Sequence, residues 1–480
     1  MEITINTTGL DRFFNLPSEQ MFWVFWGNFG WIIIGLVFIW GVLQLYLFWM
    51  YGKWAATHKT VLLAIDIPRG NEQSPKAVEN MFTYLAGAHG SINFFEKWFE
   101  GKFQKSFSYE VASLEGYTQF LIWTPKEFRN LIESSVYSQY PDAEISEVED
   151  YTQAAPQRYP DEDYDVWGVE FTQAAPWVYP IKRYQEFEHQ MGPSETQFKD
   201  PMATLMDLCG SLRQGEQLWL QYIVTPIGFD WLKDSENEIN KILGRKPKAT
   251  KSWATQGVEA LGSISEIIYP IWTDVEAEKP KEEKPKTMMD LSPVEKRRIE
   301  SVHEKLSKLA FEAKIRVVYV AQKDVMNKAK VANGIVGFMK QFGALDLNNI
   351  KPDVKKTMTR AVYFWVASRA NRKKNNIFQG YINRSSSIGI PAGIYNIEEL
   401  ATLWHFPVEA SVRASMMQKT PGKKADAPSS LPLASELSAP AEDLFKSGIF
   451  NGAPLTTNQE SLIEEKDNSE PAPPPNLPFV

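Results

Sequence analysis

One uncharged apolar stretch near the N-terminus constrains this chain more than any other feature. Residues 20–52 contain no charged side chain, and the run from Trp31 to Tyr51 reads WIIIGLVFIWGVLQLYLFWMY. A helix needs about 20 apolar residues to cross the hydrocarbon core of a bilayer. A buried helix of a soluble protein rarely runs this long without a charge, so we predict a transmembrane helix at residues 21–52.

The residues that flank this stretch predict how it lies in the membrane. A cleaved signal peptide is disfavoured, because residues 1–20 are acidic rather than basic and no small-residue cleavage site follows. Lys53, Lys59 and Arg69 follow the stretch, so the positive-inside rule places residues 1–20 outside and the rest in the cytoplasm of a single-pass inner-membrane protein. Aromatic residues suited to the two membrane interfaces are Trp23, Trp26, Trp31, Trp49, Tyr51 and Trp54.

Residues 59–150 have the pattern of a small α+β module. An alternating strand at residues 61–67 is followed by an amphipathic helix, and residues 107–123 alternate as a hairpin would. Thr124–Glu127 has the form of a capping box for a second helix, and residues 143–148 can supply a last strand. The order β-α-β-β-α-β predicts a ferredoxin-like module.

The same order of elements starts again further along the chain. Residues 151–226 and 311–350 together supply a second β-α-β-β-α-β unit, interrupted by residues 227–310. This helical insertion contains a charged linker at residues 275–286 and ends in a helix that begins with a capping box at Ser292. We therefore predict an α+β fold with two tandem ferredoxin-like modules.

Two segments follow the second module. Residues 351–417 are basic and helical in pattern. Residues 418–480 are rich in Pro, Ala, Ser and Glu, which predicts a disordered tail.

No sequence motif indicates catalysis. The chain contains no phosphate-binding loop, no nucleophile elbow and no zinc or calcium motif. Its single cysteine, Cys209, lies in an apolar helical stripe and is predicted to be a core residue, and His405 is predicted to pack or cap. The lack of disulfides agrees with a reducing compartment. We predict a protein that is not an enzyme and has no metal or cofactor site.

Charge is distributed unevenly along the chain, whose net charge is −8. Residues 142–170 form an acidic belt, whereas residues 351–384 are basic and contain interleaved aromatic residues. The basic segment is compatible with nucleic acid or anionic lipid; the alternatives are a solvated helical face or a partner for the acidic belt. Its bases are Lys351, Lys355, Lys356, Arg360, Arg369, Arg372, Lys373, Lys374 and Arg384.

A second aromatic segment, Phe94–Phe103, reads FFEKWFEGKF. It can lie among lipid headgroups beside the transmembrane helix. The alternative is that its rings pack over the edge of the sheet.

Six short stretches occur in an order that resembles a known family. They are Phe107–Val111, Ile122–Pro125, Tyr137–Ile145, Lys314–Tyr319, Leu347–Asp353 and Asn396–Pro407. In the last stretch, Asn396 can cap a helix that Pro407 ends. Together they resemble an uncharacterised, membrane-anchored domain that precedes the motor ATPase in predicted conjugative-transfer proteins of the type IV secretion coupling class. The likeness spans residues 59–430.

The resemblance implies a role in assembly rather than in catalysis. In the coupling proteins the domain continues into an ATPase, whereas here the tail follows, so no catalytic residue is carried over. We expect a membrane platform of a conjugation or type IV secretion apparatus that binds a separate ATPase, pore subunits or a second copy of itself. The alternative is a nucleic-acid-binding accessory that guides DNA with residues 351–384.

Overall fold

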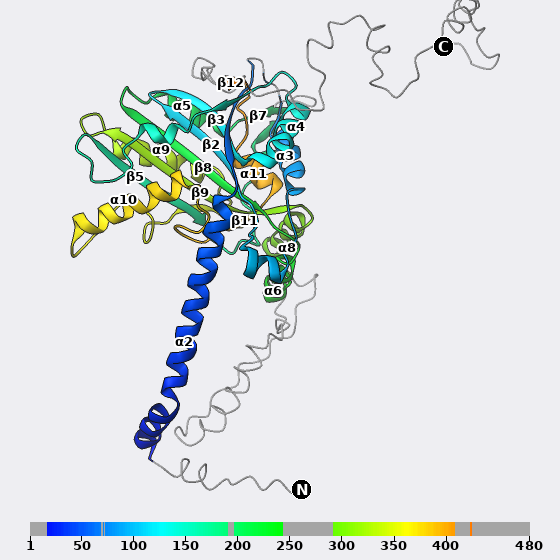
Figure 1. Cartoon of the computed structure of the whole chain (residues 1–480). Helices are drawn as coiled ribbons and strands as arrows, with labels where there is room; N and C mark the ends of the chain where they lie inside the picture. The colour runs from blue at the N-terminus through cyan, green and yellow to red at the C-terminus, as the bar shows by residue number, and fades with distance from the viewer. Residues whose placement is uncertain are drawn as a thin grey trace, which may run out of the picture. The chain divides into compact units, whose positions relative to one another are not determined.

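The computed structural model describes residues 17–68, 71, 73–190, 196–242, 291–408 and 423–424. Three predictions lie outside this set: nearly all of the extracytoplasmic segment 1–20, the charged linker 275–286, and the tail 418–480 apart from residues 423–424. The described residues form a mixed fold of helices and antiparallel sheet, as the sequence predicts (Figure 1).

The N-terminal helix α2 extends from Ser18 to Ala56 and contains the predicted apolar stretch. Its part from Gly30 to Ala56 has a mean hydropathy of 2.2 and is long and apolar enough to cross a membrane. Only residues 57–59 separate it from the first strand of the sheet, β1 (Thr60–Asp66).

The six elements predicted for residues 59–150 are present, and we call this half of the sheet, with its two helices, the first half. Their order in space is β2-β3-β1-β4, and α3 and α4 pack against each other. The elements are β1, α3 (Lys76–Ala86), β2 (Phe107–Leu114), β3 (Tyr117–Pro125), α4 (Arg129–Gln139) and β4 (Glu144–Val148).

The second half repeats this arrangement, with spatial order β10-β5-β9-β8 and with α5 packed against α9. Two described helices of the insertion, α6 (Leu232–Ile242) and α8 (Pro293–Leu306), lie between β8 and β9 in the chain. The repeated elements are β5 (Tyr164–Gln173), α5 (Met202–Gly210), β8 (Glu216–Pro226), β9 (Ala310–Gln322), α9 (Lys328–Lys340) and β10 (Ile350–Pro352).

The two halves form one continuous sheet rather than separate tandem modules. β2 and β8 pair antiparallel from Phe107↔Val224 to Leu114↔Gln217. The joined order is β10-β5-β9-β8-β2-β3-β1-β4. With the strands numbered along the chain within each half, this order is 4-1-3-2 followed by 2-3-1-4. A two-fold axis between β2 and β8 would produce such an order. Because both faces of β2 are covered inside this sheet, its polar residues Ser108 and Glu110 are as buried as its apolar ones.

Short strands extend this sheet or lie beside it. β11 (Gly393–Asn396) pairs with β9, and β12 (Lys423–Lys424) pairs with the outer strand β4. A small separate sheet consists of β6 (Glu188–Gln190) and β7 (Thr196–Phe198).

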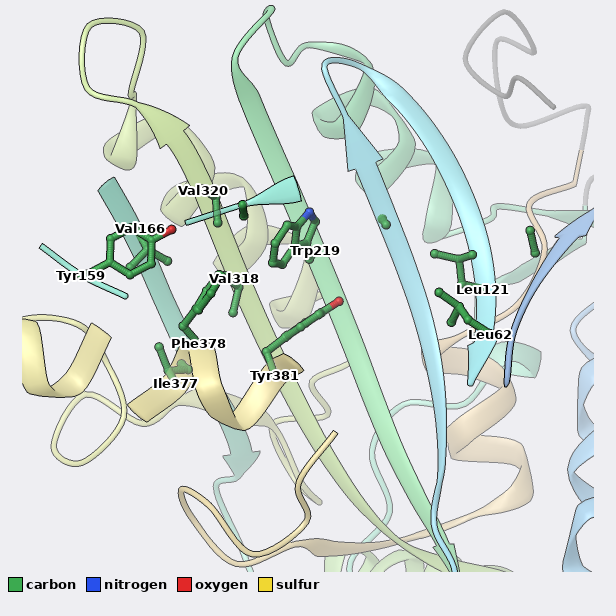
Figure 2. Packing of buried hydrophobic residues seen from close by; sticks show 13 residues of the cluster. Leu62, Leu121, Tyr159, Val166, Trp219, Val318, Val320, Ile377, Phe378 and Tyr381 are labelled. Carbon is green, nitrogen blue, oxygen red and sulfur yellow. The ribbon is translucent and has the colours of Figure 1, made fainter. Parts of the chain in front are cut away.

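Each face of the sheet has its own helical cover. On one face the Phe82 ring of α3 lies 4.8 Å from Tyr109, and Trp404, which follows α11 (Ile397–Leu403), also lies 4.8 Å from Tyr109. On the other face, α10 (Val366–Ile382) places Phe378 and Tyr381 against Trp219 of β8 (Figure 2).

Two of the three predicted helix caps are confirmed. Ser292 Oγ accepts from Glu295 N at 3.3 Å, and Asn396 Oδ1 accepts from Glu399 N at 2.9 Å. The box at Thr124 is wrong, because β3 continues through this residue, which pairs with Val61 of β1. A short 3-10 turn then precedes α4, whose start has no side-chain cap.

Candidate functional site

The end of α2 is joined to the sheet by an aromatic junction. The Trp54 ring lies 4.8 Å from Phe103 and the Tyr51 ring 5.8 Å from it, while Lys105 Nζ is 5.2 Å from the centre of the Trp54 ring. Gly101, with φ +71°, makes this approach possible, since a Cβ there would lie 2.5 Å from the backbone of α2. Tyr51 and Trp54, predicted as interface residues, are therefore half-buried in the junction.

The segment Phe94–Phe103 packs beside α2 rather than over the sheet edge. Its helical part, η1 (Glu96–Glu100), contacts α2 directly. Phe94, Phe95 and Phe99 are 63–71% exposed, and their rings contact one another and Trp98. Such a cluster presents apolar rings at the end of a helix that can span a membrane.

The remaining predicted interface residues lie along α2. All of them are exposed on the surface of the helix. They are Trp23, Trp26, Trp31 and Trp49.

The nine predicted bases of residues 351–384 fall into two groups. The group that the structure leaves exposed consists of Lys351, Lys355, Lys356, Arg360, Arg369 and Arg372. The other three are engaged within the chain. Lys373 Nζ donates to the carbonyl oxygens of Lys355 and Arg360, at 2.9 and 3.2 Å.

Lys374 and Arg384 pair with the acidic belt. Lys374 Nζ lies 2.5 Å from Asp165, which also accepts from Lys328. Burial by itself raises the pKa of Asp165, but these two ammonium groups lower it overall. Arg384 is buried against Asp150 and Glu110; burial by itself lowers the pKa of its guanidinium, but these carboxylates raise it overall.

A buried row of polar side chains crosses the join between the two halves. Glu170 of β5, Arg316 of β9, Gln221 of β8 and Glu110 of β2 are register partners on four adjacent strands. Arg316 donates to Glu170 at 2.6 Å and to Gln221 at 3.0 Å, and Gln221 Nε2 donates to Glu110 at 3.0 Å. Arg384 completes the row at 3.0 Å from Glu110. We call these five residues the polar row.

The polar row has the chemistry of a structural network. Each of its charged groups has a charged partner inside the fold, and all five side chains are at most 5% exposed. A buried charge is stable only when it is paired and hydrogen-bonded. Sequence reasoning missed this row, although a charged or amide side chain inside each of four largely apolar strands was a usable signal.

Residues 362–366, which we call the aromatic tip, lead into the first residue of α10 and read VYFWV. Tyr363, Phe364 and Trp365 are 81–83% exposed, and the flanking Val362 and Val366 are about half exposed. From the sequence these aromatic residues are predicted only to lie among the bases of residues 351–384. Their exposure could not be predicted, because hydrophobic periodicity does not show which side chains stay uncovered.

The other singled-out residues have structural surroundings. Cys209 is buried in the core, as predicted, and burial raises the pKa of its thiol to about 12. His405 is buried, with Nδ1 2.8 Å from the Ala401 carbonyl oxygen and Nε2 2.9 Å from Asp200. Both are packing positions.

Comparison with known proteins gives one match. The model of a domain family of unknown function, DUF8128, matches residues 57–392, which is more than two thirds of the chain. No curated protein and no solved structure matches. The match agrees with the resemblance to an uncharacterised domain family.

Proposed function

This chain belongs to the DUF8128 family, and we propose that it is a membrane-anchored, non-catalytic platform that recruits other protein subunits at the cytoplasmic face of the membrane. The observation that carries the proposal is the junction between α2 and the sheet. Three residues connect the helix to β1, and Trp54, Phe103 and Gly101 hold its end against the body. Such a junction suits a body held close to a bilayer rather than one on a flexible tether.

The internal pairing of charge supports a non-catalytic role. Structural ion-pair networks also shift pKa values, so the shifts of the Arg384 and Lys305 pKa values do not by themselves indicate a catalytic site. Here the buried charged residues of the polar row, and the Lys305–Glu399 pair at 2.9 Å between α8 and α11, form structural pairs. Their arrangement stabilises one packing of the chain.

The outer edge of the sheet supports recruitment of partners. We propose that each half is a ferredoxin-like module, and β2 and β8 already cover each other's edge. The outer strand β4 carries Glu144 and Glu147 and pairs with the chain's own Lys423 and Lys424. An added strand gains main-chain hydrogen bonds, so a basic extended segment of a partner fits this edge in place of Lys423 and Lys424.

The kind of apparatus rests on the sequence resemblance. The likeness to the domain of the type IV secretion coupling class motivates a separate secretion or conjugation ATPase, or a pore subunit, as the partner. We propose this assignment on that basis alone.

Orientation is tested by labelling introduced cysteines of the full chain in spheroplasts. Cys209 is buried and serves as the internal site that labels only after denaturation. A membrane-impermeant maleimide should label Thr7→Cys and should reach Lys296→Cys only after lysis. Labelling of Lys296→Cys in sealed spheroplasts would overturn the orientation.

Recruitment is tested by purifying the tagged, detergent-solubilised full chain from its own cells and identifying bound proteins by mass spectrometry. We expect an ATPase or pore subunit to be recovered with the wild type. Glu147→Lys reverses a charge on the β4 edge and should reduce that recovery, whereas Glu300→Lys on the exposed face of α8 should not. Recovery of the chain alone would overturn the platform.

A further inference from the structure

We propose that the aromatic tip is a second membrane contact, which inserts into the interface of a leaflet that contains anionic lipid. This inference rests on the proposed membrane anchoring. Its first support is exposure: five consecutive large apolar residues, Val362–Val366, lie uncovered beside α10. Contiguous exposed apolar surface of this kind marks an interaction site.

The backbone holds the tip in an outward conformation. Tyr363 and Trp365 have φ values of +72° and +50°, a region that a residue with a side chain adopts only at a cost in free energy. Arg369 stabilises the loop, since its Nη1 donates to the Val362 carbonyl oxygen at 3.1 Å and its backbone N to the Trp365 carbonyl oxygen at 3.0 Å. The rings are therefore presented by a pinned turn.

The surroundings of the tip are basic. Between residues 354 and 384 the chain contains no acidic residue. Exposed bases stand on both sides of the tip: Lys355, Lys356 and Arg360 before it, Arg369 and Arg372 after it. Bases near an anionic leaflet each add about 1 kcal/mol of attraction, which falls off within a Debye length.

The composition of the tip favours lipid over nucleic acid. Trp and Tyr concentrate at the membrane interface, and the aliphatic Val362 and Val366 extend the apolar surface beyond rings that could stack on bases. Lys374 and Arg384, which would add to a nucleic-acid surface, are held by Asp165 and Asp150 instead. The chain also has a helix, α2, suited to spanning the bilayer that the tip would enter.

The test places a fluorophore on the tip of the full chain. Phe364→Cys is labelled with an environment-sensitive dye, and Cys209 stays unlabelled because it is buried. The labelled chain is reconstituted into vesicles of phosphatidylcholine alone or with phosphatidylglycerol, some of which carry a nitroxide on the acyl chain. Ser386→Cys, an exposed position beyond α10, is the matched control.

We expect the dye at residue 364 to shift to shorter wavelength and to lose most of its emission to the nitroxide in anionic vesicles, while the dye at residue 386 does neither. Neutralising Lys355, Arg360 and Arg372 to Gln should weaken insertion about fivefold for each base. Arg369 is kept because it pins the loop.

The outcomes separate the two proposals. A chain that floats with the vesicles but shows no quenching at residue 364 overturns the inference and leaves the platform intact. A chain that does not float overturns both. A dye that responds to single-stranded DNA in detergent at physiological salt, and not to lipid, assigns the tip to nucleic acid and also overturns the inference.

Discussion

The two halves of the sheet have the same strand order but connect their second and third strands differently. In the first half, β2 and β3 are joined by the two-residue turn Glu115–Gly116. In the second half, β8 and β9 are joined by residues 227–309, yet they pair in register from Glu216↔Ala321 to Pro226↔Phe311. The comparison shows that register is set by the paired faces, because the entropy cost of closing a loop grows only slowly with its length.

The face opposite α3 and α5 is covered in the second half by α10. In the second half, Ile377 and Phe378 of α10 pack against Val166 and Val318 (Figure 2). Arg384, just beyond α10, reaches across to Glu110 of the first half. The basic segment therefore covers the second half with α10 and bonds to the first half through Arg384.

Removing Arg316 should have the largest effect on how the halves are joined. Arg316→Met leaves the Glu170 carboxylate buried without its partner, which costs about 3–5 kcal/mol of unfolding free energy. Denaturant unfolding of the full chain in detergent, followed by tryptophan fluorescence, measures this cost. The double variant Glu170→Gln with Arg316→Met should recover the part of this cost that comes from the unpaired carboxylate, while Gln221 Oε1 and the Ser385 carbonyl oxygen still lack the donor Arg316. An unchanged midpoint for Arg316→Met would contradict the role of the polar row.

A smaller effect is expected at the short turn of the first half. Gly116 has φ +92°, and a Cβ there would lie 3.3 Å from the Leu212 carbonyl oxygen, so Gly116→Ala should cost about 1–2 kcal/mol. Gly337 in α9 of the second half is the control, since nothing lies within 4 Å of a Cβ there and Gly337→Ala should stabilise by about 0.5–1 kcal/mol. The same unfolding assay decides; equal effects of the two substitutions would be incompatible with this difference.

A further prediction concerns pH and Lys314 of β9. Burial lowers the pKa of this ammonium to about 8. Below pH 8 the folded chain carries the full cost of burying the charge; between pH 8 and 10.5 the unfolded chain binds more protons, so the stability contributed at this site rises with pH. Lys314→Met should therefore stabilise the chain at pH 7, and the gain should shrink toward pH 10.

The Ile388 carbonyl oxygen, which accepts a hydrogen bond from Lys314, keeps a donor in the Lys314→Met variant. Arg316 Nη2 also donates to the Ile388 carbonyl oxygen, at 2.9 Å. A stability difference between Lys314→Met and the wild type that stays constant from pH 7 to 10 would show that Lys314 does not titrate in this range.

Much of the fold could be predicted from local pattern. The strand and helix order of both halves was read correctly, and the caps at Ser292 and Asn396 are confirmed. The cap at Thr124 failed because pairing with β1 outweighed a local signal. Less of the candidate site could be predicted from the sequence. The sequence identifies nine bases as one group, but contacts with Asp165 and Asp150 remove Lys374 and Arg384 from the exposed surface.

By itself the sequence determined the apolar helix α2, the two β-α-β-β-α-β orders and the basic, aromatic character of residues 351–384. Hydrophobic periodicity and helix caps depend on residues a few positions apart, so these features can be predicted from the sequence. Only the tertiary structure decided the pairing of β2 with β8, the polar row, and the exposure of the aromatic tip. These features depend on contacts, or on the lack of contacts, between side chains far apart in the sequence, and a local sequence pattern does not encode them.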